Sequence, residues 1–235
     1  MPQAVRGDSD SWKAADDVEI VSFSQEAGEP VQLGGNLWGK VYAGRMRFKD
    51  GSVHRVAIKR FEIKRFEFKP MTDEKAEEYQ DAIDGLRAAG VSLPKMGMVK
   101  LRKGTVFGRE ALQEDEWVQV SQLFGSAGGS KLTGAERLVD LTDAQRVEAA
   151  QNLAKVANAG YLVPKDLFGF LESGAPVPFD IDLIVMHGRH PPRQRAESLS
   201  EAVYSLSLGV EERRRMLMEA AMKAASDEVR AEFRR

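Results

Sequence analysis

The sequence contains no cysteine, which excludes disulfide bonds and thiolate zinc sites. No uninterrupted apolar run reaches about 18 residues, so no segment is predicted to span a bilayer. The chain also lacks a charged segment followed by an apolar one at its start, so residues 1–17 are expected to form a polar tail instead of a secretory leader. These absences suit a cytoplasmic protein, and export by a dedicated secretion machine stays open.

An excess of charge of one sign is missing as well. The chain has 34 basic and 36 acidic side chains in 235 residues, which gives a formal net charge of -2. Because no large field of one sign is present, neither nucleic acid nor a membrane surface is an expected partner. A chain of this length can bury one good core or two small lobes packed on each other.

The first half of the chain has the composition of β-strands. Residues 18–66 are rich in Val, Ile, Phe and Tyr, and Asp50-Gly51 between two such runs predicts a hairpin. Residues 96–101 and 116–124 show the same patterning, so about five strands are expected.

One helix is expected between these strands, over residues 72–89. Thr72 offers an N-cap, acidic residues fill the first turn, and Leu86 belongs to an apolar stripe of helical spacing. Gly90 suits the end of that helix because glycine accepts a left-handed backbone conformation there.

The second half is predicted to be mostly helical, which makes the fold class α+β. Residues 143–159 form an amphipathic helix pattern, and the chain is again helical from Glu201 onward. Two short strands, residues 167–171 and 177–184, are expected between them, joined by a turn at Gly174.

A Gly/Ser-rich break over residues 125–134 is the expected boundary between lobes. The predicted segments are a polar tail at 1–17, an N-terminal lobe at 18–124, and a C-terminal lobe with a terminal helix at 125–235.

A glycine-rich turn followed by a lysine is the main chemical signal of the first half. Gly34, Gly35 and Gly39 lie between two predicted strands, and Lys59 is the last residue of a Val-Ala-Ile-Lys run on the next strand. Glycines let the backbone amides of a hairpin close over phosphates, which side chains would block. A lysine on the following strand can reach phosphate oxygens as a point charge.

These two motifs together resemble the glycine-rich loop and the strand-three lysine of the protein kinase superfamily. The resemblance implies a two-lobed kinase-like fold with a five-stranded N-lobe sheet plus one helix, and it implies ATP and Mg²⁺ as cofactors. Asn36 departs from the pattern, since it stands where the middle glycine usually is. The positions that the resemblance assigns to nucleotide binding are Leu33, Gly34, Gly35, Asn36, Trp38, Gly39, Val41, Ala57, Lys59, Gln122 and Phe124.

In the kinase superfamily a carboxylate on the following helix holds the lysine. Asp81 falls at the matching position when the count runs back from the helix end, and Glu78 lies one turn earlier with a longer side chain. Either carboxylate can be the partner of Lys59, and both can be solvated helix charges.

The second half carries acids at the places where kinases have a catalytic and a metal-binding aspartate. The resemblance implies that Asp166 orients the substrate hydroxyl and that Lys165 neutralises a phosphate oxygen. It also implies that Asp180 binds magnesium, with Asp182 as a further carboxylate ligand. Read singly, each of these acids is better explained as a turn residue or a strand-end cap, and a functional role is favoured only together with the glycine-rich loop and Lys59.

The second half also departs from the kinase pattern. Pro164-Lys165 replaces the usual His-Arg, Leu171 stands at the place of the usual asparagine, and Asp180-Ile181-Asp182 replaces Asp-Phe-Gly. The chain after Asp182 is too short for the usual peptide-substrate subdomain. In this shortened plan the sequence looks like the minimal effector kinases that some bacteria deliver into eukaryotic hosts.

The leading hypothesis is therefore transfer of the γ-phosphate of ATP to a hydroxyl of a folded protein, Ser or Thr more than Tyr. A host protein is one candidate substrate. Three alternatives stay open: a pseudokinase that binds without turnover, a small-molecule kinase of the aminoglycoside or choline type, and a protein AMP-transferase on the same fold.

Overall fold

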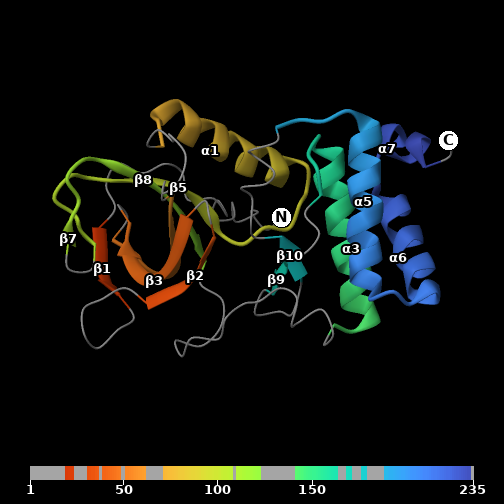
Figure 1. The fold of residues 1–235 in the computed structure, drawn as a ribbon, viewed down its shortest axis with the longest axis horizontal. Helices are drawn as coiled ribbons and strands as arrows, with labels where there is room; N and C mark the ends of the chain where they lie inside the picture. Colours follow the sequence, from red (N-terminus) through yellow and green to blue (C-terminus); the bar gives the residue numbers. More distant parts are fainter. Residues whose placement is uncertain are drawn as a thin grey trace, which may run out of the picture. The chain divides into compact units, whose positions relative to one another are not determined.

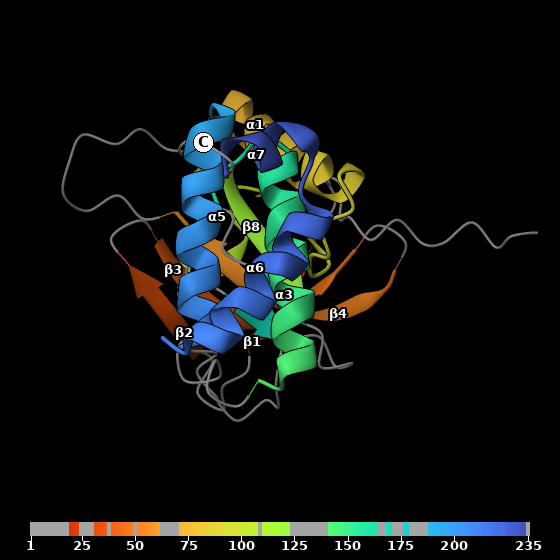
Figure 2. The same cartoon turned by 90° about the vertical axis from the view of Figure 1, so that its right-hand side faces the viewer.

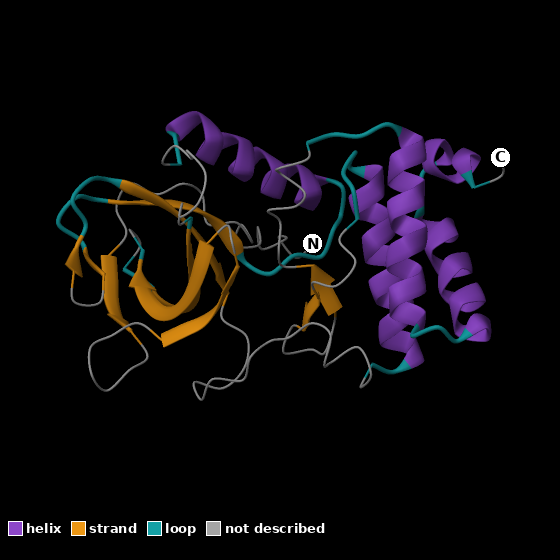
Figure 3. Ribbon diagram, in the orientation of Figure 1, coloured by secondary structure: helices purple, strands orange, loops and turns teal. Residues whose placement is uncertain are grey.

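The computed structural model describes residues 19–23, 31–36, 39–48, 51–61, 71–107, 110–122, 141–163, 168–170, 176–178 and 188–233. The fold is α+β, as expected, with an antiparallel sheet in the first part of the chain and mostly helices in the second (Figure 1, Figure 3). The chain divides into two compact units: residues 1–80 with 95–131, and residues 81–94 with 132–235.

The sheet of the first unit has six strands, where the sequence predicted five. They are β1 (Glu19–Phe23), β2 (Val31–Asn36), β3 (Gly39–Arg47), β4 (Val53–Arg60), β5 (Met96–Leu101) and β8 (Glu116–Gln122). The order is β1-β3-β4-β8-β5, and β2 also pairs with β3. The additional strand has a simple origin, because β1 pairs with residues 44–47 of β3 and β2 pairs with residues 39–43. The two segments therefore share one edge of β3.

Two connections of the sheet follow from local sequence. The predicted hairpin between β3 and β4 is confirmed: the Gly51 N–H donates to the Phe48 carbonyl at 2.8 Å, and Gly51 has a φ of 79°. A side chain is strained at that φ, so the turn needs its glycine. A small second hairpin, β6 (Val106–Phe107) with β7 (Glu110–Ala111), lies in the chain between β5 and β8.

The pleat of the sheet separates its side chains into two faces. One face forms the apolar core of the first unit, made by Met46, Val56, Ile58, Val99, Leu101, Leu112, Val118 and Val120. The residues that alternate with these on β3, β4, β8 and β5 occupy the opposite face, which α1 (Asp73–Ala88) contacts. We call this second side the helix-covered face.

Helix α1 has the ends that the sequence predicted. The Thr72 hydroxyl accepts a hydrogen bond from the Lys75 N–H at 3.2 Å, which confirms the N-cap. At the other end Gly90 has a φ of 75°, and the Val91 N–H reaches back to the Leu86 carbonyl at 3.0 Å.

The second unit is built on three helices that lie side by side: α3 (Asp143–Asn158), α5 (Pro192–Ser207) and α6 (Glu211–Ala224) (Figure 2). A short helix α7 (Asp227–Glu232) follows, and the hairpin of β9 (Phe168–Phe170) and β10 (Pro176–Pro178) belongs to the same unit. The core is made by apolar side chains of all four helices, among them Leu153, Leu199, Leu217 and Val229. Within the described residues no helix has both the length and the apolar composition needed to cross a membrane.

The predicted helical segment from Glu201 onward is present, but it is divided among α5, α6 and α7. Helix α5 begins earlier, at Pro192, because proline is well tolerated in a first helical turn, where its missing N–H has no partner to lose. It also ends earlier, where Leu208 adopts a left-handed conformation with a φ of 53°. A new N-cap at Ser226 then separates α6 from α7.

Candidate functional site

One cross-strand row of the sheet brings together three of the predicted nucleotide-binding positions. Gly34 of β2 is the register partner of Val41 of β3, and Val41 is the partner of Lys59 of β4. The row continues to Gln119 of β8 and Met98 of β5. Directly opposed residues of antiparallel strands lie on one face, with Cβ atoms about 5 Å apart. We call this set the lysine row, and it lies on the helix-covered face.

The next row on the same face holds Ala57, another predicted position. Ala57 is the register partner of Ala43 on one side and of Ser121 on the other. Ala57, Ser121 and Val41 are half-buried, while Ala43 is buried. Small side chains, most of them apolar, thus adjoin Lys59 on this face.

The backbone around the glycines is irregular in one place. The register of β2 on β3 shifts between Gln32 and Gly34, so Leu33 occupies a bulge. Beyond the bulge, Gly35 pairs with Lys40 and Asn36 pairs with Gly39 at the turn end. Trp38, predicted at the tip of this turn, lies outside the described residues, and so does Phe124.

Neither carboxylate that the sequence proposed for Lys59 is buried. Glu78 is exposed and forms an ion pair with Lys75, one turn earlier on the same helix. Asp81 is an exposed residue of the second half of α1. The pairing of Lys59 with either acid stays a prediction.

Gln119, which the sequence analysis did not single out, is the unusual member of the lysine row. Its side chain is 5% exposed, and within the described residues its Oε1 is buried without a hydrogen-bond partner. A buried acceptor that lacks a donor costs about 1–3 kcal/mol. The sequence held a signal for it, because a glutamine between Val118 and Val120 alternates with the core face of the strand.

Helix α1 is fixed to the strands beneath it by polar contacts. The Asp73 Oδ1 accepts from the Lys100 Nζ at 2.7 Å and from the Trp117 Nε1 at 2.6 Å, and these two hydrogen bonds lower the pKa of Asp73. Further along the helix, the Gln80 Oε1 accepts from the backbone N–H of Met98 at 2.9 Å. The lysine row therefore lies on a face whose covering helix is tied at two places along β5 and β8.

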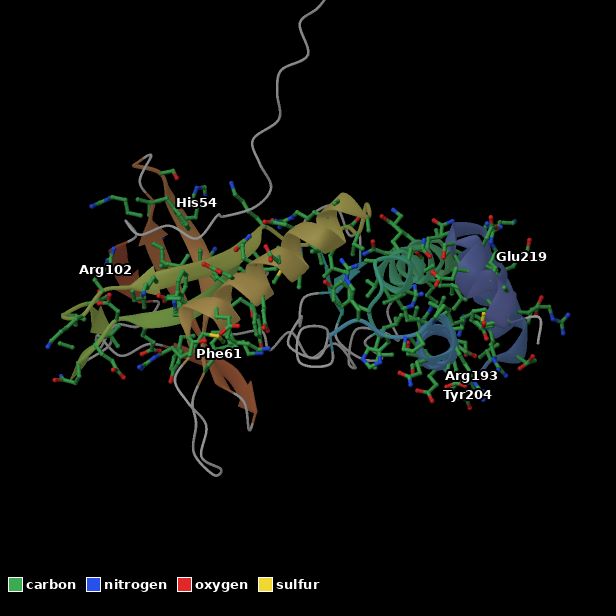
Figure 4. All side chains as sticks on the ribbon, turned by 90° about the horizontal axis from the view of Figure 1, so that it is seen from above. His54, Phe61, Arg102, Arg193, Tyr204 and Glu219 are labelled. Carbon is green, nitrogen blue, oxygen red and sulfur yellow. The ribbon has the colours of Figure 1, made fainter. Side chains whose placement is uncertain are left out.

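An aromatic contact adds to this attachment at the end of β4. The rings of Phe61 and Tyr79 meet edge to face with centroids 5.4 Å apart, and Figure 4 marks Phe61 near α1. Tyr79 is buried, and Phe61 lies two residues after Lys59. The strand that carries the lysine is thus packed against the helix just beyond it.

The predicted acids of the second half, Asp166, Asp180 and Asp182, lie outside the described residues, as does Lys165. Gln122 is the last residue of β8. Its backbone is the register partner of Val56, a residue of the apolar core face.

The described residues on either side of these acids are well held. The Val163 N–H donates to the Ser198 hydroxyl at 3.1 Å, and the His190 N–H donates to the Gly160 carbonyl at 2.8 Å. The chain therefore leaves and rejoins one place, the end of α3 beside the first turns of α5. The hairpin within this segment pairs Phe168, its first residue, with the last residue of β10.

In the described part of the chain, no group of three or more His, Asp or Glu side chains is placed to hold a metal ion. The predicted magnesium ligands are not among these residues, so the magnesium site stays a prediction.

A hollow of about 310 Å³ lies on the surface of the second unit, lined by Ser200, Glu201, Tyr204, Ser205 and Arg214. The Arg214 guanidinium lies 5.5 Å from the centre of the Tyr204 ring and 3.7 Å from the Glu211 carboxylate. The Arg214 cation thus interacts with residues of α5 and α6. None of the predicted site residues lines this hollow. Figure 4 marks Tyr204 on this surface.

No protein-family model matches the sequence, and no curated protein matches it.

Proposed function

We propose that the protein binds Mg-ATP on the helix-covered face of its first unit and transfers the γ-phosphate to a hydroxyl of a folded protein. The observation that carries this proposal is the lysine row. It aligns Gly34, Val41 and Lys59 side by side on three adjacent strands.

The architecture of the first unit supports the kinase-like interpretation. Strands β1 and β2 pair with the same edge of β3, so the six strands fill five positions across the sheet. Helix α1 follows the strand of the lysine, which is the place that the resemblance requires for the helix.

The chemistry of the row fits a nucleotide. The Lys59 ammonium is the point charge for the α- and β-phosphates, and the glycines of β2 leave the backbone open to approach. Val41 and Ala57 offer half-buried apolar contacts to an adenine ring. Bound magnesium would neutralise the charge that develops on the phosphates, with Asp180 and Asp182 as its proposed ligands.

The proposed group for the acceptor is Asp166, on the resemblance to kinases alone. Asp166 would orient the acceptor hydroxyl and take its proton while the hydroxyl oxygen bonds to the γ-phosphorus. The bond from the γ-phosphorus to its bridging oxygen breaks in the same step, and ADP leaves with that oxygen.

The test compares wild-type protein with Lys59→Ala, using ATP labelled separately at the α- and γ-phosphates and whole-cell lysate as acceptor. Label from γ alone is expected, and Lys59→Ala is expected to lose it while remaining folded. The matched control is Lys103→Ala, which removes an exposed lysine of the same unit outside the row.

Label from α alone would identify an AMP-transferase, and label from neither with retained ATP binding would identify a pseudokinase. Near-normal turnover by Lys59→Ala with unchanged ATP dependence would refute the nucleotide site itself.

The proposed acceptor is a folded protein, recognised by its shape. Unfolding the labelled acceptor should abolish its labelling. Efficient labelling of the denatured acceptor, or of a short peptide that contains its site, would contradict this expectation.

A further inference from the structure

We infer that Gln119 is the positioning residue for Lys59, with its side-chain oxygen accepting a hydrogen bond from the Lys59 ammonium when phosphates are bound. The inference rests on the proposed function, because it names the group that orients the lysine of that site.

The register places the two side chains within reach of each other. Lys59 and Gln119 are direct partners across β4 and β8, so their side chains stand on the same face. Opposed Cβ atoms lie about 5 Å apart, and both side chains are long enough to bridge that separation. An ammonium has three donors, so Lys59 can serve the amide oxygen and a phosphate oxygen together.

The buried oxygen indicates that Gln119 is present for a reason other than packing. It has no donor within the described residues, and an apolar side chain of similar volume would avoid that cost. Gln80, a second glutamine at the same contact of helix and sheet, has its oxygen satisfied by the Met98 N–H at 2.9 Å. A side chain that lowers stability through an unsatisfied polar atom is expected at a site where a ligand or a catalytic group supplies the missing hydrogen bond.

The placement of the acidic candidates favours the same conclusion. Glu78 is exposed and paired with Lys75, whereas Gln119 is buried beside Lys59 in the lysine row. An amide acceptor differs from a carboxylate in one respect that matters for binding. It orients the ammonium without neutralising it, which leaves the full positive charge for the phosphates.

The experiment measures two quantities for each variant: the affinity for a fluorescent ADP analogue with magnesium, and the melting temperature without nucleotide. The variants are Gln119→Met, Gln119→Glu, Lys59→Ala and the double variant Lys59→Ala with Gln119→Met. Gln113→Met is the matched control, because it makes the same substitution at an exposed glutamine of the same unit.

Gln119→Met is expected to bind the analogue about tenfold more weakly, the factor for losing a hydrogen bond to a charged group. Its melting temperature is expected to stay equal or rise, since the unsatisfied oxygen is gone. Gln119→Glu keeps an acceptor oxygen and is expected to bind within about threefold of wild type. It should melt at a lower temperature, because it buries a carboxylate. The double variant should bind no more weakly than Lys59→Ala alone, because Gln119 acts through the lysine.

A purely structural glutamine gives the opposite pattern, with Gln119→Met binding like wild type, and that result would overturn the inference. Additive losses in the double variant would also overturn it, because Gln119 would then contact the ligand by itself. Loss of affinity in Glu78→Gln or Asp81→Asn, with Gln119→Met unaffected, would assign the lysine to a helix carboxylate instead. Failure of the proposed function looks different: the wild type then binds no analogue, or Lys59→Ala binds it equally well.

Discussion

Two arginines hold the C-terminal end of α5, and we predict that replacing the buried one destabilises the second unit more than replacing the partly exposed one. Arg146 of α3 is 1% exposed, and its guanidinium donates to the carbonyls of Leu206 at 2.5 Å and Leu141 at 3.2 Å. Arg213 of α6 is more exposed. It donates to the Ser207 carbonyl at 3.2 Å and to an Asp143 carboxylate oxygen at 3.1 Å.

The magnitude follows from what each substitution leaves behind. Arg146→Met strands two acceptors among buried residues, at about 1–3 kcal/mol each, and relieves the cost of burying a charge, which is the main cause that lowers the pKa of Arg146. The net loss is expected to be about 2–4 kcal/mol. Arg213→Met removes a partly exposed ion pair and a single hydrogen bond to the Ser207 carbonyl, so its loss is expected to be about 1–2 kcal/mol.

Hydrogen exchange of the α5 amides, together with urea unfolding, measures both losses. Exchange is needed because a chain with two compact units need not unfold in one step. Equal losses for Arg146→Met and Arg213→Met, or a loss for Arg146→Met below about 1 kcal/mol, would refute the assumption that buried helix-end carbonyls depend on this guanidinium. The comparison bears on function because α3 and α5 flank the segment that carries the proposed catalytic acids.

Three further predictions concern single side chains. Asp73→Asn should make the stability of α1 less sensitive to acid. In the wild type the pKa of Asp73 is lowered, first by its hydrogen bond from Lys100. The stabilising effect of Asp73 is therefore complete above its ordinary pKa of 3.8 and is lost as the pH falls through the lower pKa of the folded protein. Melting temperatures of wild type and variant from about pH 5 to about pH 2 check this, and parallel curves would contradict it. Asn152→Leu should lower the free energy of unfolding, measured in urea, by about 1–3 kcal/mol, because it removes both hydrogen bonds between Asn152 of α3 and the backbone of Ser92. An unchanged free energy of unfolding would show that these bonds do not contribute. Asp180→Asn should abolish magnesium-dependent transfer and Asp182→Asn should weaken it, and a magnesium titration in which Asp182→Asn matches wild type would favour a single-ligand role for Asp180.

The sequence by itself determined the elements whose signals are local. Thr72 and Gly90 mark the two ends of α1, and Gly51 marks the turn between β3 and β4. These predictions were confirmed because capping and turn formation depend on a few neighbouring residues and on backbone angles that glycine alone adopts easily. The helices after Pro192 were predicted less well, since one apolar stripe continues through α6 and α7 although the backbone breaks between them.

Only the tertiary structure decided which residues share a face and which are buried there. The sequence proposed Lys59 together with a carboxylate of the following helix, while strand pairing set Gln119 beside Lys59 and left Glu78 exposed. Register between strands depends on contacts far apart in the chain, and a shift by one residue turns every side chain to the other face. For that reason the candidate lysine could be read from its motif, whereas its neighbour could be found only once the strands were paired.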